Sequence, residues 1–210
     1  MQPAIEQTQP KTKTAPNLKM TYKEFLDWCD EDTLAEWVDG EIVMTSPASL
    51  EHQSIGSFLI RILSEFVEHH EMGMIIHAPF QMKLKDSGRE PDLLFVAKEN
   101  LGRLRKTYLD GAADLAIEII SPESGTRDRG EKFYEYEAGG VREFWLIDPI
   151  RQQAEFYQLG ENKLYQHVAP DASGVYYSKV VAGFWLKVNW LWEQPLRPTR
   201  EVLKELGLMK

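Results

Sequence analysis

The sequence has little cysteine, no long apolar run and no excess of positive charge. Cys29 is the only cysteine in 210 residues, which excludes an internal disulfide and suits a reducing compartment such as the cytoplasm. No run approaches the roughly eighteen apolar residues of a membrane span, and no apolar secretory signal is present. The formal net charge is −9, whereas proteins that bind nucleic acid through charge alone are usually basic. We therefore expect a cytoplasmic protein without a membrane span, and weak or assisted binding to nucleic acid.

The composition indicates one globular domain preceded by a polar tail. Hydrophobic residues make up 43% of the chain and include six tryptophans, enough for a sizeable core. The first nineteen residues are instead rich in Gln, Thr, Pro and Lys. We predict a disordered tail over residues 1–19 and a single domain over residues 20–210.

Apolar periodicity predicts an α/β fold. The clearest signal is a stripe from Ile55 to Val67, which predicts a long helix, and Asp39-Gly40 between two β-like runs predicts a hairpin. An Asp86-Ser87-Gly88 turn is expected between the first two of the strands that follow. The predicted order is helix 21–29, hairpin strands 34–38 and 41–44, the long helix, strands 74–85, 91–97 and 114–120, helix 128–138, strand 142–148, a β meander over 152–188, and helix 199–206.

Two carboxylates stand within apolar strands. Asp92 begins the strand that continues as Leu-Leu-Phe-Val, and Glu118 lies inside Leu-Ala-Ile-Glu-Ile-Ile. An unpaired charge buried in such a strand is costly, but two acids on neighbouring strands can share one hard cation. Magnesium fits this pair because it prefers oxygen ligands and keeps several waters. The alternative is that each acid pairs with an Arg or Lys inside the fold or points outward.

Several short segments occur in a characteristic order between residues 20 and 190. They are Glu36-Trp37-Val38-Asp39-Gly40-Glu41, Ser46-Pro47 with His52-Gln53, Pro91-Asp92, Ile117-Glu118-Ile119-Ile120-Ser121-Pro122, Asp128 through Lys132 to Tyr136, Ala138-Gly139-Gly140-Val141, and Glu143-Phe144-Trp145-Leu146-Ile147-Asp148-Pro149. Together with the order of elements, this set resembles the PD-(D/E)XK nuclease superfamily and, within it, the Uma-type restriction endonuclease family.

The resemblance implies a restriction-endonuclease-like core of helix, three strands, helix and strand around a mixed sheet. It also implies a Mg²⁺- or Mn²⁺-dependent endonuclease acting on DNA, with Asp92 and Glu118 on the metal. The superfamily's lysine two residues after the glutamate is absent, because Ile120 occupies that place. In the Uma-type group this lysine comes from the next helix, which points to Lys132. Without the resemblance, Lys132 would be an ordinary solvated lysine.

Four further residues are candidates for the site. The resemblance places Glu36 near the metal as a third ligand or a water-positioning group; the alternative is an exposed hairpin glutamate. His52 and Gln53 open the long helix, where they could contact substrate phosphate or cap the helix. Tyr136, one turn after Lys132, is expected to support the site by packing or by a hydrogen bond.

Two rival functions remain open. One is a catalytically inactive nuclease-fold module that binds nucleic acid or takes part in assembly, which the acidic net charge and the missing lysine favour. The other is a glycoside hydrolase using paired carboxylates without a metal. A homodimer is expected for the endonuclease, because two sites suit the cutting of two strands.

Overall fold

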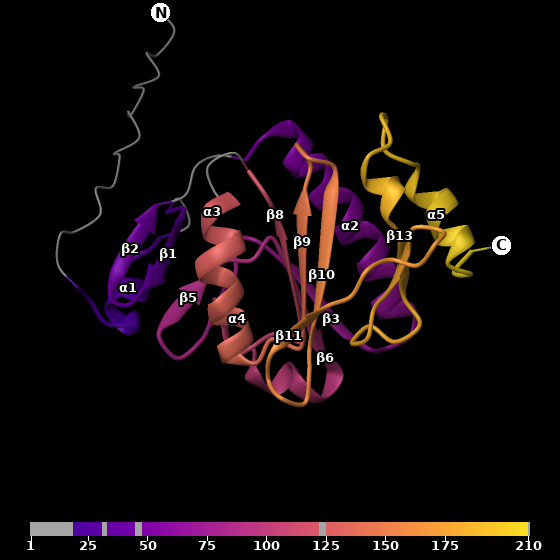
Figure 1. The fold of residues 1–210 in the computed structure, drawn as a ribbon. Helices are drawn as coiled ribbons and strands as arrows, with labels where there is room; N and C mark the ends of the chain where they lie inside the picture. Colours follow the sequence, from indigo (N-terminus) through magenta and orange to yellow (C-terminus); the bar gives the residue numbers. More distant parts are fainter. Residues whose placement is uncertain (1–18, 31–32, 45–47, 122–124, 210) are drawn as a thin grey trace, which may run out of the picture.

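A computed structural model describes residues 19–30, 33–44, 48–121 and 125–209. Helices pack on both faces of a central six-stranded sheet, and a smaller sheet lies beside it (Figure 1). Residues 1–18 of the predicted tail, the Ser46-Pro47 pair and Pro122 lie outside the described residues. None of the helices in the described ranges combines the length and apolar character that crossing a membrane requires.

The six-stranded sheet is mixed, as the α/β prediction requires. Its order is β11-β10-β9-β8-β6-β3, in which β8 and β9 pair in parallel and the other neighbours pair antiparallel. The three central strands β6, β8 and β9 are buried along their whole length, which explains their apolar sequences. The strands are β3 (Gly73–His77), β6 (Leu93–Ala97), β8 (Leu115–Ile119), β9 (Glu143–Asp148), β10 (Gln153–Leu159) and β11 (Tyr165–His167).

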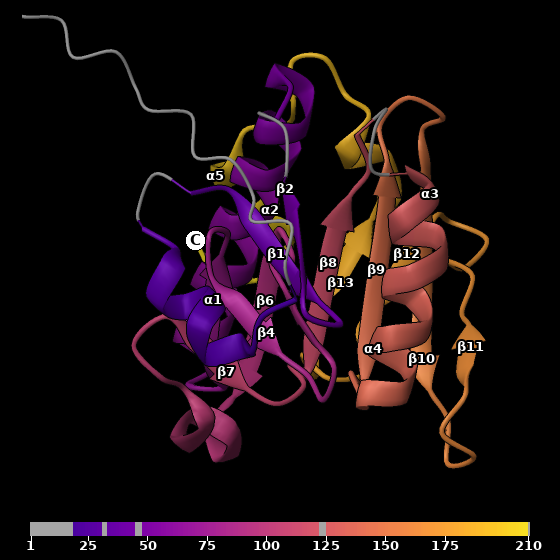
Figure 2. The same ribbon diagram turned by 90° about the vertical axis from the view of Figure 1, so that its left-hand side faces the viewer.

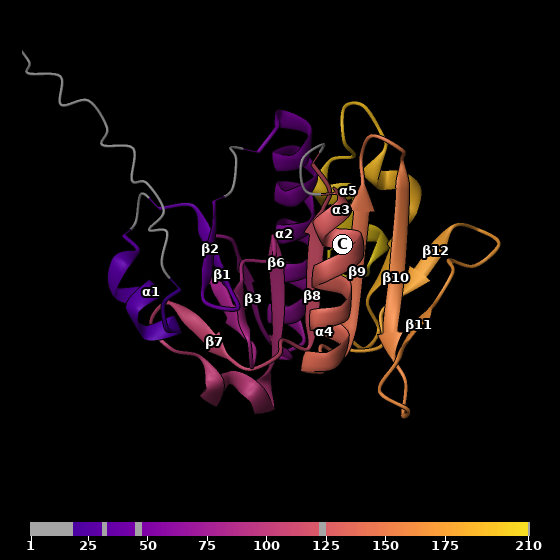
Figure 3. The same ribbon diagram turned by 60° about the vertical axis from the view of Figure 1, so that its left-hand side comes forward.

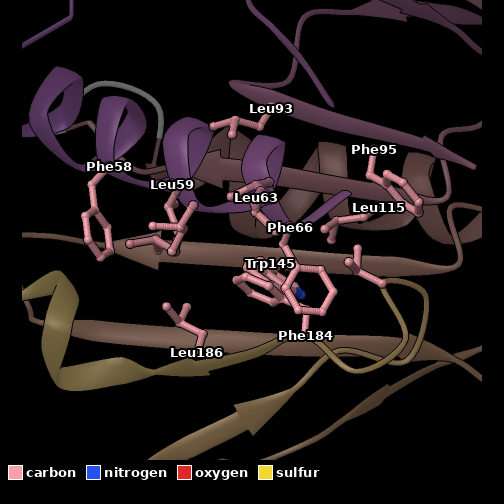
Figure 4. Close-up of a cluster of buried hydrophobic side chains, with 14 of the residues drawn as sticks. Phe58, Leu59, Leu63, Phe66, Leu93, Phe95, Leu115, Trp145, Phe184 and Leu186 are labelled. Atoms are coloured by element: carbon pink, nitrogen blue, oxygen red, sulfur yellow. The ribbon is translucent and has the colours of Figure 1, made fainter. Parts of the chain in front are cut away.

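One face of this sheet packs against the long helix α2 (Leu50–His69). The helix is capped by Ser49, whose hydroxyl accepts a hydrogen bond from the backbone N–H of His52 at 3.2 Å. Its predicted apolar stripe is buried against the sheet and the C-terminal segment, where Phe66 and Trp145 lie close to Phe184 (Figure 4). The prediction of a long helix is confirmed. The capping residue is Ser49, not His52 or Gln53.

The opposite face is covered by a second helical segment, which lies in front of the strands in Figure 3 while α2 lies behind them. It comprises α3 (Gly125–Arg127), a π-helical turn η2 (Asp128–Lys132) and α4 (Phe133–Gly139). Gly140 ends the segment in the left-handed region at φ 87°, where glycine carries no steric penalty. The predicted helix 128–138 is thus confirmed.

The smaller sheet has the order β2-β1-β5-β4-β7, and α1 packs beside it (Figure 2). The predicted Asp-Gly hairpin and the first helix are both present, and Thr21 caps that helix in a capping box with Glu24. The elements are α1 (Tyr22–Trp28), β1 (Ala35–Val38), β2 (Glu41–Met44), β4 (Gln81–Lys83), β5 (Ser87–Arg89) and β7 (Tyr108–Asp110), with a 3₁₀ turn, η1 (Lys98–Arg103), between β6 and β7.

Two predictions between the long helix and β6 are wrong. The single strand 74–85 is divided into β3 in the large sheet and β4 in the small one. Pro79 lies at the break and has no N–H to donate to a continuous ladder. The Asp86-Ser87-Gly88 turn is also misplaced, because Ser87 and Gly88 belong to β5 and pair with β1.

The C-terminal meander is divided between two sheets. β10 and β11 extend the large sheet, whereas β12 (Val175–Tyr177) and β13 (Trp185–Lys187) form a separate ribbon. A 3₁₀ turn, η3 (Val188–Leu191), and the predicted last helix, α5 (Thr199–Glu205), follow.

Glu143, at the start of β9, joins this C-terminal part to the sheet. Its fully buried carboxylate accepts hydrogen bonds from Trp145 Nε1 at 2.7 Å and from the Tyr176 hydroxyl at 2.9 Å. It also accepts the backbone N–H groups of Lys179 at 2.8 Å and Val180 at 3.1 Å. The Glu143 carboxylate is therefore the shared acceptor for all four of these hydrogen-bond donors.

Glu143→Gln should lower the free energy of unfolding by about 2–4 kcal/mol, because an amide NH₂ cannot accept the hydrogen bonds that one carboxylate oxygen accepts now. Urea denaturation followed by tryptophan fluorescence measures this change. The control, Glu161→Gln, alters an exposed glutamate and should shift the free energy by less than about 0.5 kcal/mol. Equal midpoints for the two variants would contradict the role of Glu143.

Candidate active site

The two candidate carboxylates lie at one end of the β6–β8 strand pair, Glu118 within β8 and Asp92 one residue before β6. Leu93 pairs with Ile117, so continuing this antiparallel register by one residue sets Asp92 opposite Glu118. The backbone N–H of Ile119 donates a hydrogen bond to Asp92 Oδ2 at 2.6 Å. The Asp92 side chain is 21% exposed, whereas that of Glu118 is only 4% exposed. Solvent therefore reaches the Asp92 carboxylate but hardly reaches that of Glu118.

The ammonium group of Lys132 lies among three carboxylates. Its Nζ is 2.9 Å from Glu118 Oε2, 3.2 Å from Glu36 Oε1 and 3.4 Å from Asp128 Oδ1. The side chain is 7% exposed, so the interpretation of Lys132 as an ordinary solvated lysine is wrong. Burial alone would lower the pKa of this amine, but the three carboxylates outweigh burial and raise it. Lys132 is therefore a buried cation.

Glu118 uses both of its oxygens in this cluster. While Oε2 faces Lys132, Oε1 accepts a hydrogen bond from the Tyr136 hydroxyl at 2.6 Å. Burial raises the pKa of Glu118 well above its usual range; Lys132 opposes the shift, and the neighbouring carboxylates of Asp128 and Asp92 add to it. The expected supporting role of Tyr136 is thus a direct hydrogen bond.

Glu36 reaches the same cluster from β1 and is 1% exposed, so the exposed-hairpin alternative is wrong. Its carboxylate accepts hydrogen bonds from Arg89 Nη1 at 3.0 Å and from the backbone N–H of Glu90 at 3.1 Å. Burial would raise the pKa of Glu36, but Lys132 and Arg89 outweigh burial and lower it. Glu36 is held as a charged group beside Lys132.

Two residues of the cluster were not singled out from the sequence. Arg89 is fully buried and donates to Glu36 and also to Glu135 and Glu131 on the covering helix. No sequence pattern identifies it, because its segment Ser-Gly-Arg has no apolar alternation. Asp128 is buried one helical turn before Lys132. Residues 128, 132 and 136 are spaced by four and so share one helix face, and this spacing is the signal in the sequence that places Asp128 beside Lys132.

Glu90 lies between Arg89 and the Pro91-Asp92 pair. Burial raises the pKa of Glu90 to about 7, with a further contribution from the nearby charge of Glu36. Its carboxylate is therefore a further ionisable group close to the cluster.

His52 and Gln53, adjacent on α2, have different surroundings. His52 Nε2 lies 3.2 Å from Asp92 Oδ2; burial would lower the pKa of His52, but Asp92 outweighs burial and raises it. Gln53 is exposed and lines a separate cavity of about 780 Å³ formed with residues 191–196. The fold brings His52 to the carboxylates but leaves Gln53 outside them.

The donor chemistry at Asp92 and Glu118 fits a hard divalent cation. Among the residues that the structure describes, no three His, Cys, Asp or Glu side chains form a ready ligand group. Magnesium does not require one, since it is commonly held by one or two carboxylates with waters and substrate phosphate completing its shell.

Comparison with known proteins identifies a family and a related fold. The profile of the Uma2 family, described as "Putative restriction endonuclease", matches residues 22–189. The chain belongs to the Uma2 family. A crystal structure of a "putative nuclease" of DUF820 from Anabaena variabilis has the same fold, with a TM-score of 0.71 at 19% identity, over 82% of this chain and 97% of that one. No curated protein matches the chain.

In this Uma2 protein the strand position two residues after Glu118 is part of the core. Ile120 stands where the wider nuclease superfamily has lysine, and it is 5% exposed in the apolar cluster beneath α4. Lys132 brings its amine to Glu118 from the covering helix instead. The position on the strand is therefore available for packing.

Lys132→Met should lower the free energy of unfolding at pH 7 by about 3–5 kcal/mol, because it leaves buried carboxylates without their shared partner. Chemical denaturation measures the loss. The control, Lys23→Met, removes a lysine with an exposed i,i+4 ion pair to Asp27 and should cost less than about 0.5 kcal/mol. Similar stabilities of the two variants would mean that Lys132 does not hold the cluster together.

Proposed function

We propose that this chain is a Mg²⁺- or Mn²⁺-dependent endonuclease that hydrolyses phosphodiester bonds in DNA. The observation that carries the proposal is the convergence of Asp92 and Glu118 on paired strands with the buried ammonium of Lys132 2.9 Å from Glu118. Membership in a family described as restriction endonucleases supports the same reaction. Asp92 and Glu118 would hold the cation.

When bound, the cation would offset charge on the scissile phosphate and lower the pKa of an attacking water. Lys132 would hold that water and stabilise the additional negative charge of the transition state. Glu36, itself fixed by Arg89, would keep the Lys132 ammonium directed toward Glu118. In this proposal Glu36 positions Lys132 rather than binding the cation.

The substrate side of the site is proposed at His52. Its ring lies beside the partly exposed Asp92, where a protonated imidazole could donate to a phosphate oxygen. Gln53 remains a predicted substrate contact, from a position outside the carboxylate cluster. A homodimer with two such sites remains our expectation for an enzyme that cuts both strands.

A second candidate is a nuclease-fold module that binds nucleic acid without turnover. It is favoured by one observation, namely that Lys132 already pairs with Glu118 and so occupies part of the position where a cation would bind. Such a module would bind DNA equally well with or without Asp92 and would show no thermal shift with divalent metal.

Asp92→Asn and Glu118→Gln should each reduce the rate of plasmid nicking with Mg²⁺ or Mn²⁺ by at least about 100-fold, because each removes a proposed ligand of the cation. Gel electrophoresis of supercoiled DNA measures the rate. Asp27→Asn, at a side chain 72% exposed on α1, is the control and should cut at the wild-type rate. Failure of the wild type to cut DNA with either metal would favour the non-catalytic module.

A further inference from the structure

A cavity of about 500 Å³ lies where the parallel strands β8 and β9 end. Ligands of open α/β sheets bind preferentially at the carboxyl ends of strands. The cavity is separate from the pocket at Gln53, and two arginines and one aspartate are its charged lining residues. Its lining includes Ile120, Ser121, Arg129, Asp148, Ile150 and Arg151.

Asp148 is a buried carboxylate that pairs with both Arg129 and Arg151. Its side chain is 2% exposed and lies 2.9 Å from Arg129 Nη2 and 3.2 Å from Arg151 Nη1. The backbone N–H of Arg151 also donates to Asp148 Oδ1 at 2.9 Å. Both guanidinium groups are therefore anchored on a carboxylate that is itself out of contact with solvent.

The arginines, by contrast, are accessible. The Arg151 side chain is 66% exposed and that of Arg129 is 29% exposed. Arg129 also contacts Glu155 on β10, which does not line the cavity. The most exposed charge that lines this cavity is therefore the guanidinium of Arg151, on a protein whose net charge is −9.

The cavity adjoins the carboxylate cluster. Arg129 lies between Asp128 and Lys132 on the π-helical turn. Glu118 pairs with Leu146, and Asp148 is two residues further along β9 on the same face. Strand geometry therefore separates the backbones of Glu118 and Asp148 by about 8 Å. A polyanion with one phosphate at Asp92 and Glu118 would bring a neighbouring phosphate near the cavity.

We propose that Arg151 and Arg129, held by Asp148, form a second phosphate site that binds the backbone of the nucleic acid beside the bond to be cut. The planar guanidinium fork matches two phosphate oxygens, and the Asp148 anchor limits the entropy lost on binding. The proposal rests on the proposed nuclease function for its ligand. It explains how an acidic protein obtains local affinity for a phosphodiester backbone.

The test measures DNA binding without cleavage. Fluorescence anisotropy of a labelled duplex in EDTA, over a range of salt concentrations, compares the wild type with Arg151→Gln. Losing one phosphate contact should weaken binding at low salt by about tenfold and reduce the slope of log K against log salt by about 0.9. Because Arg151 is exposed, the variant should keep the wild-type thermal stability.

Arg142→Gln is the matched control. Arg142 lies beside the opposite end of β9, is 54% exposed and pairs with buried Asp114 at 3.1 Å, so it has the same local chemistry away from the cavity. Wild-type affinity and slope are expected for this variant.

The outcomes separate the two proposals. Unchanged affinity and slope in Arg151→Gln, equal losses in both variants, or no DNA binding by the wild type in EDTA would each overturn the phosphate site. Arg151-dependent binding by a wild type that cuts no DNA with Mg²⁺ or Mn²⁺ would support the site and contradict the nuclease function.

Discussion

The ammonium group of Lys132 is shared by three carboxylates that come from different parts of the fold: Glu36 from the small sheet, Glu118 from the large sheet and Asp128 from the covering helix. Carboxylates buried without a partner are strongly destabilising, so Glu118, whose partners Lys132 and Tyr136 both come from the covering helix, depends on the docking of that helix. Arg89 adds a second buried cation beneath Glu36 and ties it to the same helix. Packing of the two sheets and assembly of the site thus depend on the same contacts.

The covering helix contributes different chemistry on neighbouring positions. The face at 128, 132 and 136 carries an acid, an amine and a phenol into the cluster, whereas Arg129 points to the cavity at the ends of β8 and β9. A π-helical turn spans Asp128 to Lys132, and such turns occur frequently at functional sites. The strands supply Glu36, Glu118 and the cation Arg89, and the helix supplies Lys132 and Asp128. This division allows Ile120 to remain a core residue.

Local patterns in the sequence predicted much of the fold. The apolar stripe of α2, the Asp-Gly hairpin and the two acids in apolar strands were read from neighbouring residues, and the structure has these elements where they were expected. The division of 74–85 between two sheets, the burial of Glu36 and the role of Arg89 depend on contacts between residues far apart in the chain. Only the family resemblance places Lys132 in the site, because its position in an amphipathic helix would by itself predict a surface lysine. The functional roles of all these residues remain predictions.

The buried acids of β9 also fix how this strand can pair. Glu143 faces the side of α2 and the C-terminal ribbon, whereas Asp148 faces the covering helix and its arginines. Side chains alternate along a strand, so a slip of one residue would turn both carboxylates away from their partners at once. Phe144 and Trp145, which lie on opposite faces of β9, could exchange faces at a smaller cost in free energy, because both faces of the strand pack against apolar side chains. Glu143 and Asp148, at the two ends of β9, therefore fix the register of the strand, which its apolar central residues alone would not fix.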